Sequence, residues 1–297
     1  MILIDALMPV AGLLLEEGVP VGGQSGRIPP VRMALVNLMP DKIGTELQFL
    51  RLLGQSGRPV SVDFIRMGTH RSKGTPSDYL KRFYKTLDQI QNNRYDGLII
   101  TGAPVEKLEF EQVDYWEELT RLMEWSKRGA DKILYICWGA QAGLYHHFGI
   151  QKKTLPEKLS GVFGHERTSE RHPALKGLSL QFKGPHSRWA HIDESRLAQE
   201  PRLQVLARSK EAGSHIITDI GGRHLFLLGH MEYEADTLAK EYFRDLEKGW
   251  APKVPRNYFP ENNPKNPPSD CWREVSEQMF KNWLGTMAGR EKKVFSE

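Results

Sequence analysis

Residues 133–144 combine a reactive side chain with the residue types of a sharp turn. Four apolar residues at 133–136 predict a short buried strand that ends at Cys137. All residues from 139 to 143 except Gln141 are glycine or alanine, which allows the strand to turn sharply into a helix. Such a turn exposes the thiol, frees the amide of Trp138 to face an oxyanion, and points the positive helix end at the sulfur. The stretch predicts a nucleophile elbow; the alternative is a buried core cysteine.

A second reactive pair stands far along the chain, at His230 and Glu232. It follows another apolar run, residues 225–228, and Gly229. In extended backbone, residues two apart point to the same side, so both side chains can face one cleft. A histidine there can accept the thiol proton, and a carboxylate can orient the imidazole. The sequence therefore predicts a cysteine nucleophile with a His-x-Glu base.

The elements that must position these residues alternate along the chain. Apolar runs predict strands at 33–38, 60–65, 97–101, 133–136, 203–207, 215–218 and 225–229. Helical spacing of apolar residues predicts helices at 42–53, 77–93, 113–128 and 235–247, and a last helix at about 272–283. Strands alternating with helices favour an α/β fold: a mostly parallel, doubly wound sheet with helices on both faces. Residues 1–30, 151–200 and 249–268 are expected to be irregular, with polar loops at 158–161 and 184–188.

In such a sheet, ligands bind outside the carboxyl ends of the strands. Lys42, the loop at 101–104, Cys137 and His230 all follow strand-like runs, so one cleft could collect them. The backbone of Gly102 and Ala103 is a candidate second oxyanion donor beside Trp138. For Lys42, spacing alone favours a solvated lysine in a loop.

A further pair of charged residues lies on the helix expected behind His230. Glu241 and Arg244 are three residues apart on one face of that helix. Such a pair is usually a surface contact. Here it could instead hold the amino and carboxylate groups of an amino acid.

Composition narrows the class of protein. The 297 residues carry a formal net charge of +4 without a basic stripe, which argues against nucleic-acid binding. Two cysteines leave no disulfide framework, so we expect a cytoplasmic protein. No apolar run has membrane-spanning length, and the first residues lack the basic start of a signal peptide. The histidines at 165, 172, 186 and 191 show no metal-ligand spacing, and the adjacent pair at 146–147 should diverge on a helix, so no metal site is expected.

Several motifs together resemble a known family. The pattern C-x-G-x-Q from Cys137, with His230-x-Glu232, looks like the triad of class I glutamine amidotransferases. The fuller resemblance is to the homoserine O-acyltransferases of the trans-succinylase type, which share that fold, and it covers nearly the whole chain. The segments that carry it are 37–42, 101–104, 158–162, 185–188, 229–233, 240–245 and 254–260.

The resemblance implies an enzyme and assigns roles residue by residue. Cys137 would carry the acyl group of acyl-CoA as a thioester, His230 would be the general base and Glu232 its support. Residues implied to contact the substrate are Lys158, Ser187, Arg244, Glu241 and Lys42. No cofactor is implied beyond acyl-CoA as co-substrate; the partners are L-homoserine and a second subunit of a homodimer. The expected organisation is an N-terminal arm at 1–30, a catalytic α/β domain at 31–248 and a C-terminal extension at 249–297 on the same domain.

One position bears on the choice of acyl donor. In this family a glycine just after the T-G-A-P-x run goes with succinyl-CoA and a glutamate with acetyl-CoA; this chain has Glu106 there. The resemblance thus implies acetyl transfer for methionine biosynthesis, with Glu106 and Ser187 bearing on donor specificity. Two alternatives remain: the same reaction with succinyl-CoA and, more remotely, a glutaminase that uses the same triad.

Overall fold

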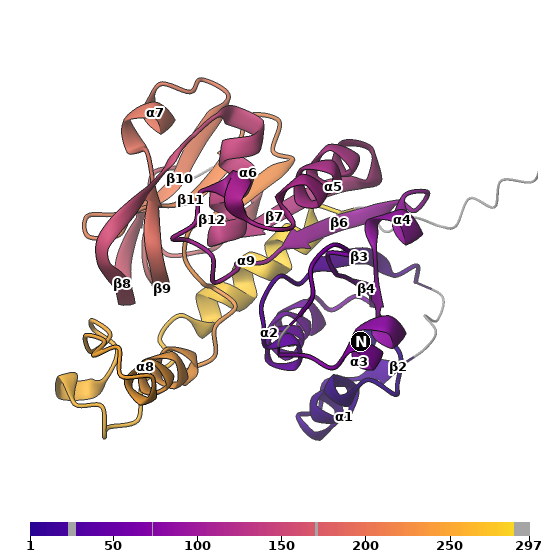
Figure 1. The fold of residues 1–297 in the computed structure, drawn as a ribbon, viewed down its shortest axis with the longest axis horizontal. Helices are drawn as coiled ribbons and strands as arrows, with labels where there is room; N and C mark the ends of the chain where they lie inside the picture. Colours follow the sequence, from indigo (N-terminus) through magenta and orange to yellow (C-terminus); the bar gives the residue numbers. More distant parts are fainter. Residues whose placement is uncertain (23–27, 73, 170–171, 288–297) are drawn as a thin grey trace, which may run out of the picture.

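The computed structural model describes residues 1–22, 28–72, 74–169 and 172–287, and one sheet organises them (Figure 1). Within these ranges twelve strands pair in the order β2-β1-β4-β3-β6-β7-β12-β11-β10-β8-β9, with β5 added beside β4. None of the helices in these ranges is long and apolar enough to cross a membrane. The α/β fold with a mostly parallel sheet is therefore as predicted.

The parallel part of the sheet is built from the first half of the chain plus one late strand. Its central members are β3 (Val31–Val36), β4 (Val60–Ile65), β6 (Tyr95–Ile100), β7 (Ala130–Ile136) and β12 (His224–Leu227). The pairing of β12 with β7 places Leu227 beside Ile136. As a result, the chain segments that follow these two strands, with Cys137 and His230, leave the same edge of the sheet.

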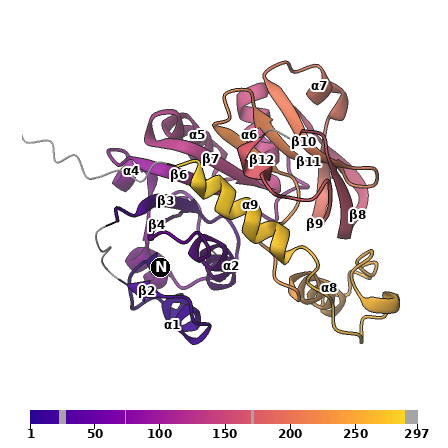
Figure 2. The ribbon, with the colours of Figure 1, turned by 180° about the vertical axis from the view of Figure 1, so that it is seen from behind.

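Helices cover both faces of this parallel part, because its strands bury apolar side chains on both sides. On one face, Met33 and Leu35 pack in a core with α1 (Pro9–Glu16), α2 (Lys42–Gly54) and α9 (Arg273–Gly285). On the other, Ala34 and Val36 pack with α5 (Trp116–Gly129) and α6 (Trp138–Phe148). Seen from behind, α9 crosses the back of the sheet beside α2 (Figure 2).

The second half of the sheet is antiparallel, and here the sequence prediction was wrong. Instead of an irregular 151–200 segment, β8 (Lys152–Arg167) and β9 (Gln181–Ile192) form a long hairpin. β10 (Leu203–Ser209) and β11 (Gly213–Asp219) join it to β12. The segments 158–161 and 184–188, expected as loops, lie within these strands. Their glycines, histidines and charges hid the strand pattern, because this hairpin has few apolar residues and faces a pocket.

Two other expectations about helices also needed correction. Residues 1–30 contain the helix α1 and the short strands β1 (Ile2–Leu3) and β2 (Val21–Gly22), which extend the sheet beside β4. The helix expected at 77–93 is broken: α3 (Ser77–Phe83) ends at β5 (Tyr84–Lys85), and α4 (Leu87–Ile90) follows. Tyr84 leaves the helical conformation because it pairs with β4, opposite Phe64. Residues 23–27 of the expected arm lie outside the described residues.

The C-terminal part packs on the same molecule through a small core of its own. The helix α8 (Thr237–Glu247) follows the His230 segment. The proline-rich residues after it form the short 3-10 turn η3 (Pro260–Asn262) and a single parallel bridge from Arg256 to Gly161 of β8. Tyr258, Phe259 and Trp272 of this part pack against Val162 of β8 and Leu238 of α8. The division into arm, catalytic domain and extension stays a prediction; of the extension, residues 288–297 lie outside the described part.

The packing of α6 on the sheet yields a stability prediction. A β-carbon at Gly143 would lie 2.8 Å from ring atoms of the buried Tyr135 and 3.0 Å from Phe226. Gly143→Ala should therefore lower the free energy of unfolding by about 1–3 kcal/mol, the usual cost of overpacking a core. The control is Gly12→Ala in α1, where a β-carbon meets nothing within 4 Å. It should be neutral or stabilising by up to about 1 kcal/mol. Urea unfolding measures both; equal effects would contradict this account of the packing.

Candidate active site

Cys137 lies in a tight turn between β7 and α6. Its backbone has φ 50° and ψ −115°, a conformation that residues with a side chain rarely adopt. The turn holds because α6 starts very close to the loop after β6. A β-carbon at Gly139 would lie 2.5 Å from the carbonyl oxygen of Thr101 and 2.8 Å from that of Ile100. The thiol thus sits at the N terminus of α6, beside the Thr101–Pro104 loop.

His230 and Glu232 lie together at the end of the neighbouring strand β12. The imidazole Nδ1 and the carboxylate Oε1 of Glu232 are 2.6 Å apart, and both side chains are buried. Burial alone would lower the pKa of His230. The nearby Cys137 and Glu232 outweigh it and hold that pKa well above its ordinary value. The arrangement therefore favours the protonated form of His230, between the thiol and the carboxyl group.

The triad opens into a pocket of about 800 Å³ at the carboxyl ends of the parallel strands. Its deep part includes Cys137 and His230. The other predicted site residues that line it are Gly102, Ala103, Glu106, Lys158, Ser187, Glu241 and Arg244. Trp138 and Glu232 lie behind this surface: their side chains are buried, and Glu232 reaches the pocket only through His230. One cleft thus collects these residues from six separate parts of the chain.

A hydrogen-bonded group of charged side chains forms one wall of the pocket, centred on Glu241 of α8. Its carboxylate accepts hydrogen bonds from the Ser187 hydroxyl and, at 2.7 Å, from the Tyr233 hydroxyl. The Lys158 ammonium lies 3.1 Å from Glu241 and 3.3 Å from Asp245. Burial would raise the pKa of Glu241, but Lys158 and these hydroxyls outweigh it, so the pKa is lowered. Glu241 is therefore held as a carboxylate beside the triad.

Arg244 lies one helical turn from Glu241 and is only half-buried. Its guanidinium donates to Asp245 Oδ1 from Nε at 3.0 Å and from Nη2 at 2.7 Å. Because one carboxylate oxygen takes both bonds, other N–H groups of the fork remain able to bind a ligand carboxylate in the pocket.

Glu106 lines the pocket where the Thr101–Pro104 loop leaves the sheet. Burial raises the pKa of its carboxyl group, which also interacts electrostatically with His230, Lys158 and Glu241. The glutamate is thus close enough to the triad to act on a group bound there.

Lys42 does not lie on the pocket surface. Its ammonium donates to the Asn37 carbonyl oxygen at 2.6 Å, and burial lowers its pKa to about 8. The residue behind it, Glu46, is buried too; burial raises its pKa to about 7, and Tyr84 donates to it at 2.5 Å. The structure therefore separates Lys42 from the substrate-facing residues, although the preceding Met39 and Pro40 line the pocket.

Two residues near the triad were missed from the sequence. The ring of Tyr233 stacks on His230 with centroids 4.1 Å apart, while its hydroxyl holds Glu241. Arg188 is only 1% exposed, and burial lowers its pKa to about 10. Its guanidinium donates to Ala190 O at 3.0 Å and Ala212 O at 2.6 Å. Both residues adjoin a predicted one, Glu232 or Ser187, and both end a segment that carries the family resemblance, which is the signal that could have marked them.

Two of the histidines that show no metal-ligand spacing in the sequence, His165 and His186, lie together with His215 in the structure. Strands β8, β9 and β11 bring the rings of His165, His186 and His215 together, with ligand nitrogens within 4.8 Å of one another. His165 and His186 face each other through Nε2 atoms 2.9 Å apart. Because Arg188 Nε donates to His186 Nδ1, the proton of a neutral His186 lies on Nε2 and points to His165. Burial keeps the pKa of His186 well below its ordinary value and lowers that of His165 to about 4. This arrangement favours a neutral hydrogen-bonded pair over metal ligation.

His146 and His147 are also closer than expected. Their ring centroids are 4.7 Å apart, and with Glu124 they form a second group of side chains within reach of one metal ion. The Nε2 atoms of the two rings are, however, engaged separately: His146 with Glu124 at 2.7 Å and His147 with the Tyr135 hydroxyl at 2.9 Å.

Comparisons with known proteins agree with this geometry. A family model described as homoserine O-succinyltransferase matches residues 2–293. A homoserine O-acetyltransferase of Lachnospira eligens is 44% identical, over 95% of this chain and 92% of its own length. Another, of Clostridium acetobutylicum, is 47% identical over 86% of this chain and 85% of its own. A third, of Bacillus thuringiensis subsp. konkukian, is 46% identical over 95% of both.

Solved structures support the fold alone. A glutamine amidotransferase of Thermotoga maritima matches with a TM-score of 0.57 at 15% identity, over 86% of this chain and 97% of that one. The glutaminase domain of a Trypanosoma brucei CTPS, solved with bound acivicin, matches with a TM-score of 0.51 at 10% identity, over 87% and 95%. The fold is thus that of class I glutamine amidotransferases. By the family match and the relatives together, the chain belongs to the homoserine O-succinyltransferase family.

Proposed function

We propose that this protein transfers the acetyl group of acetyl-CoA to the hydroxyl of L-homoserine through a thioester on Cys137. The observation that carries the proposal is the Cys137–His230–Glu232 arrangement at the bottom of the pocket. It is supported by relatives of 44% to 47% identity that are named homoserine O-acetyltransferases. A homodimeric state and a cytoplasmic location belong to the same proposal.

In the first half-reaction the Cys137 thiolate attacks the thioester carbonyl of the donor. The C–S bond to the enzyme forms, and negative charge moves to the carbonyl oxygen. Amides of Trp138 and of Gly102–Ala103 serve as its donors. When the tetrahedral intermediate collapses, the C–S bond to CoA breaks, and the leaving thiolate takes the proton of the His230 imidazolium.

In the second half-reaction neutral His230 removes the proton of the homoserine hydroxyl, which attacks the acetyl-enzyme carbonyl. The C–O bond of the ester forms, the bond to Cys137 breaks, and the thiolate–imidazolium pair returns. The planar guanidinium of Arg244 binds the homoserine carboxylate. The Glu241 carboxylate, which Lys158 and Ser187 hold in place, binds the homoserine ammonium group. Lys42 does not contact substrate in this mechanism; its hydrogen bond to the Asn37 carbonyl oxygen fixes the backbone there.

The donor is acetyl-CoA in this proposal because of Glu106. A succinyl group adds a carboxylate-bearing arm that would have to share the pocket with Glu106 and Glu241. Like charges in a poorly hydrated pocket repel, and the glutamate also occupies the space. Acetyl avoids both penalties.

The first prediction tests the covalent step. Purified protein given homoserine and acetyl-CoA should release free CoA, and Cys137→Ala should lower that turnover by at least about 10⁴-fold. Acid-quenched enzyme given acetyl-CoA alone should carry an acetyl group on the peptide with Cys137. Cys271→Ala is the matched control, since this second cysteine is exposed, and should keep full activity. Substantial turnover by Cys137→Ala would overturn the mechanism.

The second prediction concerns pH. The carboxylate of Glu232 favours the charged imidazole, so Glu232→Gln should lower the pKa of His230. The imidazolium is then lost earlier as the pH rises. The basic limb of the Cys137 acetylation rate, measured by stopped flow, should thus move down by about one pH unit or more. Glu117→Gln, on an exposed position of α5, should leave the profile in place. An unmoved basic limb in Glu232→Gln would show that the carboxylate does not stabilise the imidazolium.

The third prediction concerns the donor. Glu106→Gly removes both the charge and the bulk, so kcat/KM for succinyl-CoA should rise relative to acetyl-CoA by at least about tenfold. Glu106→Gln keeps the size and removes only the charge, and should produce part of that change. A wild type that already prefers succinyl-CoA, or a donor ratio that neither variant alters, would reject the role of Glu106.

A further inference from the structure

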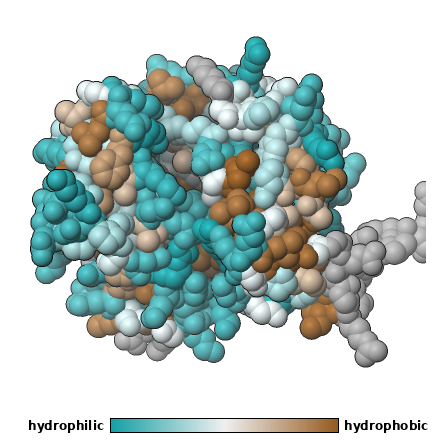
Figure 3. Space-filling model, turned by 90° about the horizontal axis from the view of Figure 1, so that it is seen from below, coloured by the Kyte–Doolittle hydropathy of each residue, from teal (hydrophilic) through white to brown (hydrophobic). Residues whose placement is uncertain are grey.

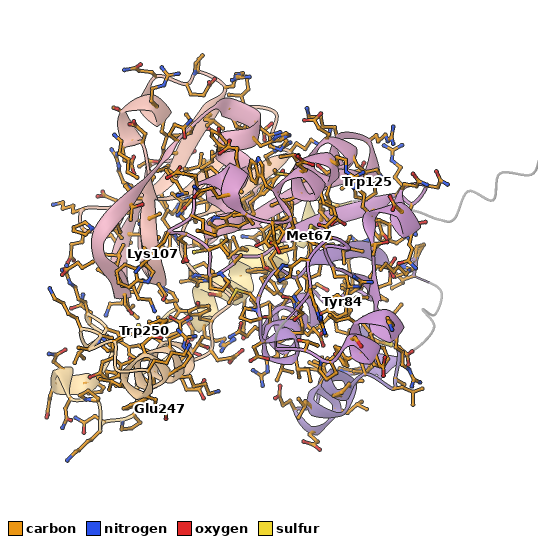
Figure 4. All side chains as sticks on the ribbon, in the orientation of Figure 1. Met67, Tyr84, Lys107, Trp125, Glu247 and Trp250 are labelled. Carbon is orange, nitrogen blue, oxygen red and sulfur yellow. The ribbon has the colours of Figure 1, made fainter. Side chains whose placement is uncertain are left out.

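The outer part of the pocket carries two lysine–tryptophan pairs. Lys107 Nζ lies 3.7 Å from the ring centroid of Trp189, and Lys248 Nζ lies 4.9 Å from that of Trp250. All four residues line the same pocket as Cys137. Lys107 comes from the loop after β6, Trp189 from β9, and the other pair from the end of α8 and the turn after it. Figure 4 places Lys107 and Trp250 on the same side of the molecule, near the lower ends of β8 and β9.

The lysines of these two pairs differ from two other cations that line the pocket. Lys158 and Arg244 are joined to carboxylates, at 3.1 Å and 2.7 Å. Among the described residues, no carboxylate forms an ion pair with the ammonium group of Lys107 or Lys248. Each ammonium group lies over an indole ring instead. Each lysine is exposed, so its ammonium is free to meet an anion in solvent. The mouth of the pocket thus has positive charge that the protein itself does not neutralise.

Trp250 is an unusual surface residue in the same place. Its side chain is 61% exposed, while Phe243 and Leu246 of the preceding helix α8 are less so, at 43% and 42%. The underside of the molecule is mainly hydrophilic, with apolar residues in separate groups (Figure 3). An indole held open beside a cationic pocket mouth is the arrangement on which nucleic-acid bases stack.

We infer that these two lysine–tryptophan pairs form the binding site for the nucleotide end of the acyl-CoA donor. Its phosphates lie against the Lys107 and Lys248 ammonium groups, and its adenine stacks on Trp250. The inference rests on the proposed function, since it takes the donor to be a CoA thioester. It follows from the depth of the pocket: the thioester must reach buried Cys137, so the charged end of the same molecule must remain at the mouth.

The arrangement separates the anions of the two substrates. Homoserine needs one cation for its carboxylate, and Arg244 lines the pocket one helical turn from Glu241. The CoA phosphates carry several negative charges and retain water, so exposed lysines suit them better than buried ones. CoA that leaves after the first half-reaction would therefore free the mouth without disturbing the residues that receive homoserine.

The test compares two donors that differ only in the nucleotide end. Acetyl-CoA has it; S-acetyl-N-acetylcysteamine has the same thioester and the start of the arm without it. In the double variant Lys107→Gln with Lys248→Gln, the KM for acetyl-CoA should rise by about tenfold, because each exposed charge contact contributes up to a factor of about five. Trp250→Leu should raise it by a similar factor through lost stacking. The kcat/KM for the short donor should be unchanged in all variants, as should the KM for homoserine.

The control is Lys81→Gln, which removes an exposed lysine from α3 on another part of the surface. As a direct probe, adenosine 3′,5′-bisphosphate should inhibit the wild type in competition with acetyl-CoA and lose affinity in the double variant. An unchanged KM for acetyl-CoA in the mouth variants would overturn the inference. So would an equal loss with the short donor, which would indicate damage to the catalytic centre. If wild type acetylated homoserine with neither donor, the proposed function itself would fail, and the two failures are therefore distinguishable.

Discussion

The close approach of α6 to the loop after β6 is the constraint on which the active site depends. Only glycine fits at position 139, because a β-carbon there would lie 2.5 Å from the Thr101 carbonyl oxygen. That approach holds Cys137 at φ 50°, in a region that costs a residue with a side chain about 1–3 kcal/mol. Gly102 lies equally close: a β-carbon built on it would be 3.3 Å from the Cβ atom of Cys137. Helix packing therefore positions the thiol and the oxyanion loop together, and β12 adds His230 beside them.

Around this centre, charge is arranged in layers. His230 and Glu232 form a buried pair, and its cationic member faces Cys137. The next layer is the Glu241 group, in which each buried charge has a partner, as buried ions require. At the mouth, among the described residues, Lys107 and Lys248 are exposed and have no carboxylate partner. Their charge lies where water can reach it, and there it can attract an anionic substrate without a large desolvation cost.

The parallel half of the fold could be predicted from the sequence, including the strands that precede Cys137 and His230, and the reason is physical. Strands buried on both faces must be apolar throughout, so residues such as those of β6 and β7 are recognisable from the sequence alone. The β8–β9 hairpin has one polar face over the pocket, and Lys158 and Ser187 looked like loop residues for that reason. The contact of His165 with His186, 21 residues apart, depends on hairpin register, which no local pattern specifies. The burial of Lys42 was likewise invisible, because it depends on packing against Tyr84 of β5, which lies 42 residues further along the chain.

The fold shared with glutamine amidotransferases does not by itself decide the reaction. Those structures match at 10% to 15% identity, and a Cys-His-Glu arrangement is chemically compatible with any acyl transfer that passes through a thioester. What the triad cannot decide is which nucleophile receives the acyl group. In this chain the residues around it come from β8, β9 and α8: Lys158, Ser187 and Glu241. These elements lie on the antiparallel side of the sheet and in the segment that follows β12. In the proposed mechanism the covalent chemistry therefore resides in the parallel core, homoserine is bound by residues of the polar hairpin and α8, and the donor is selected by Glu106 in the loop after β6. Of these parts, only the hairpin was not recognisable from the sequence.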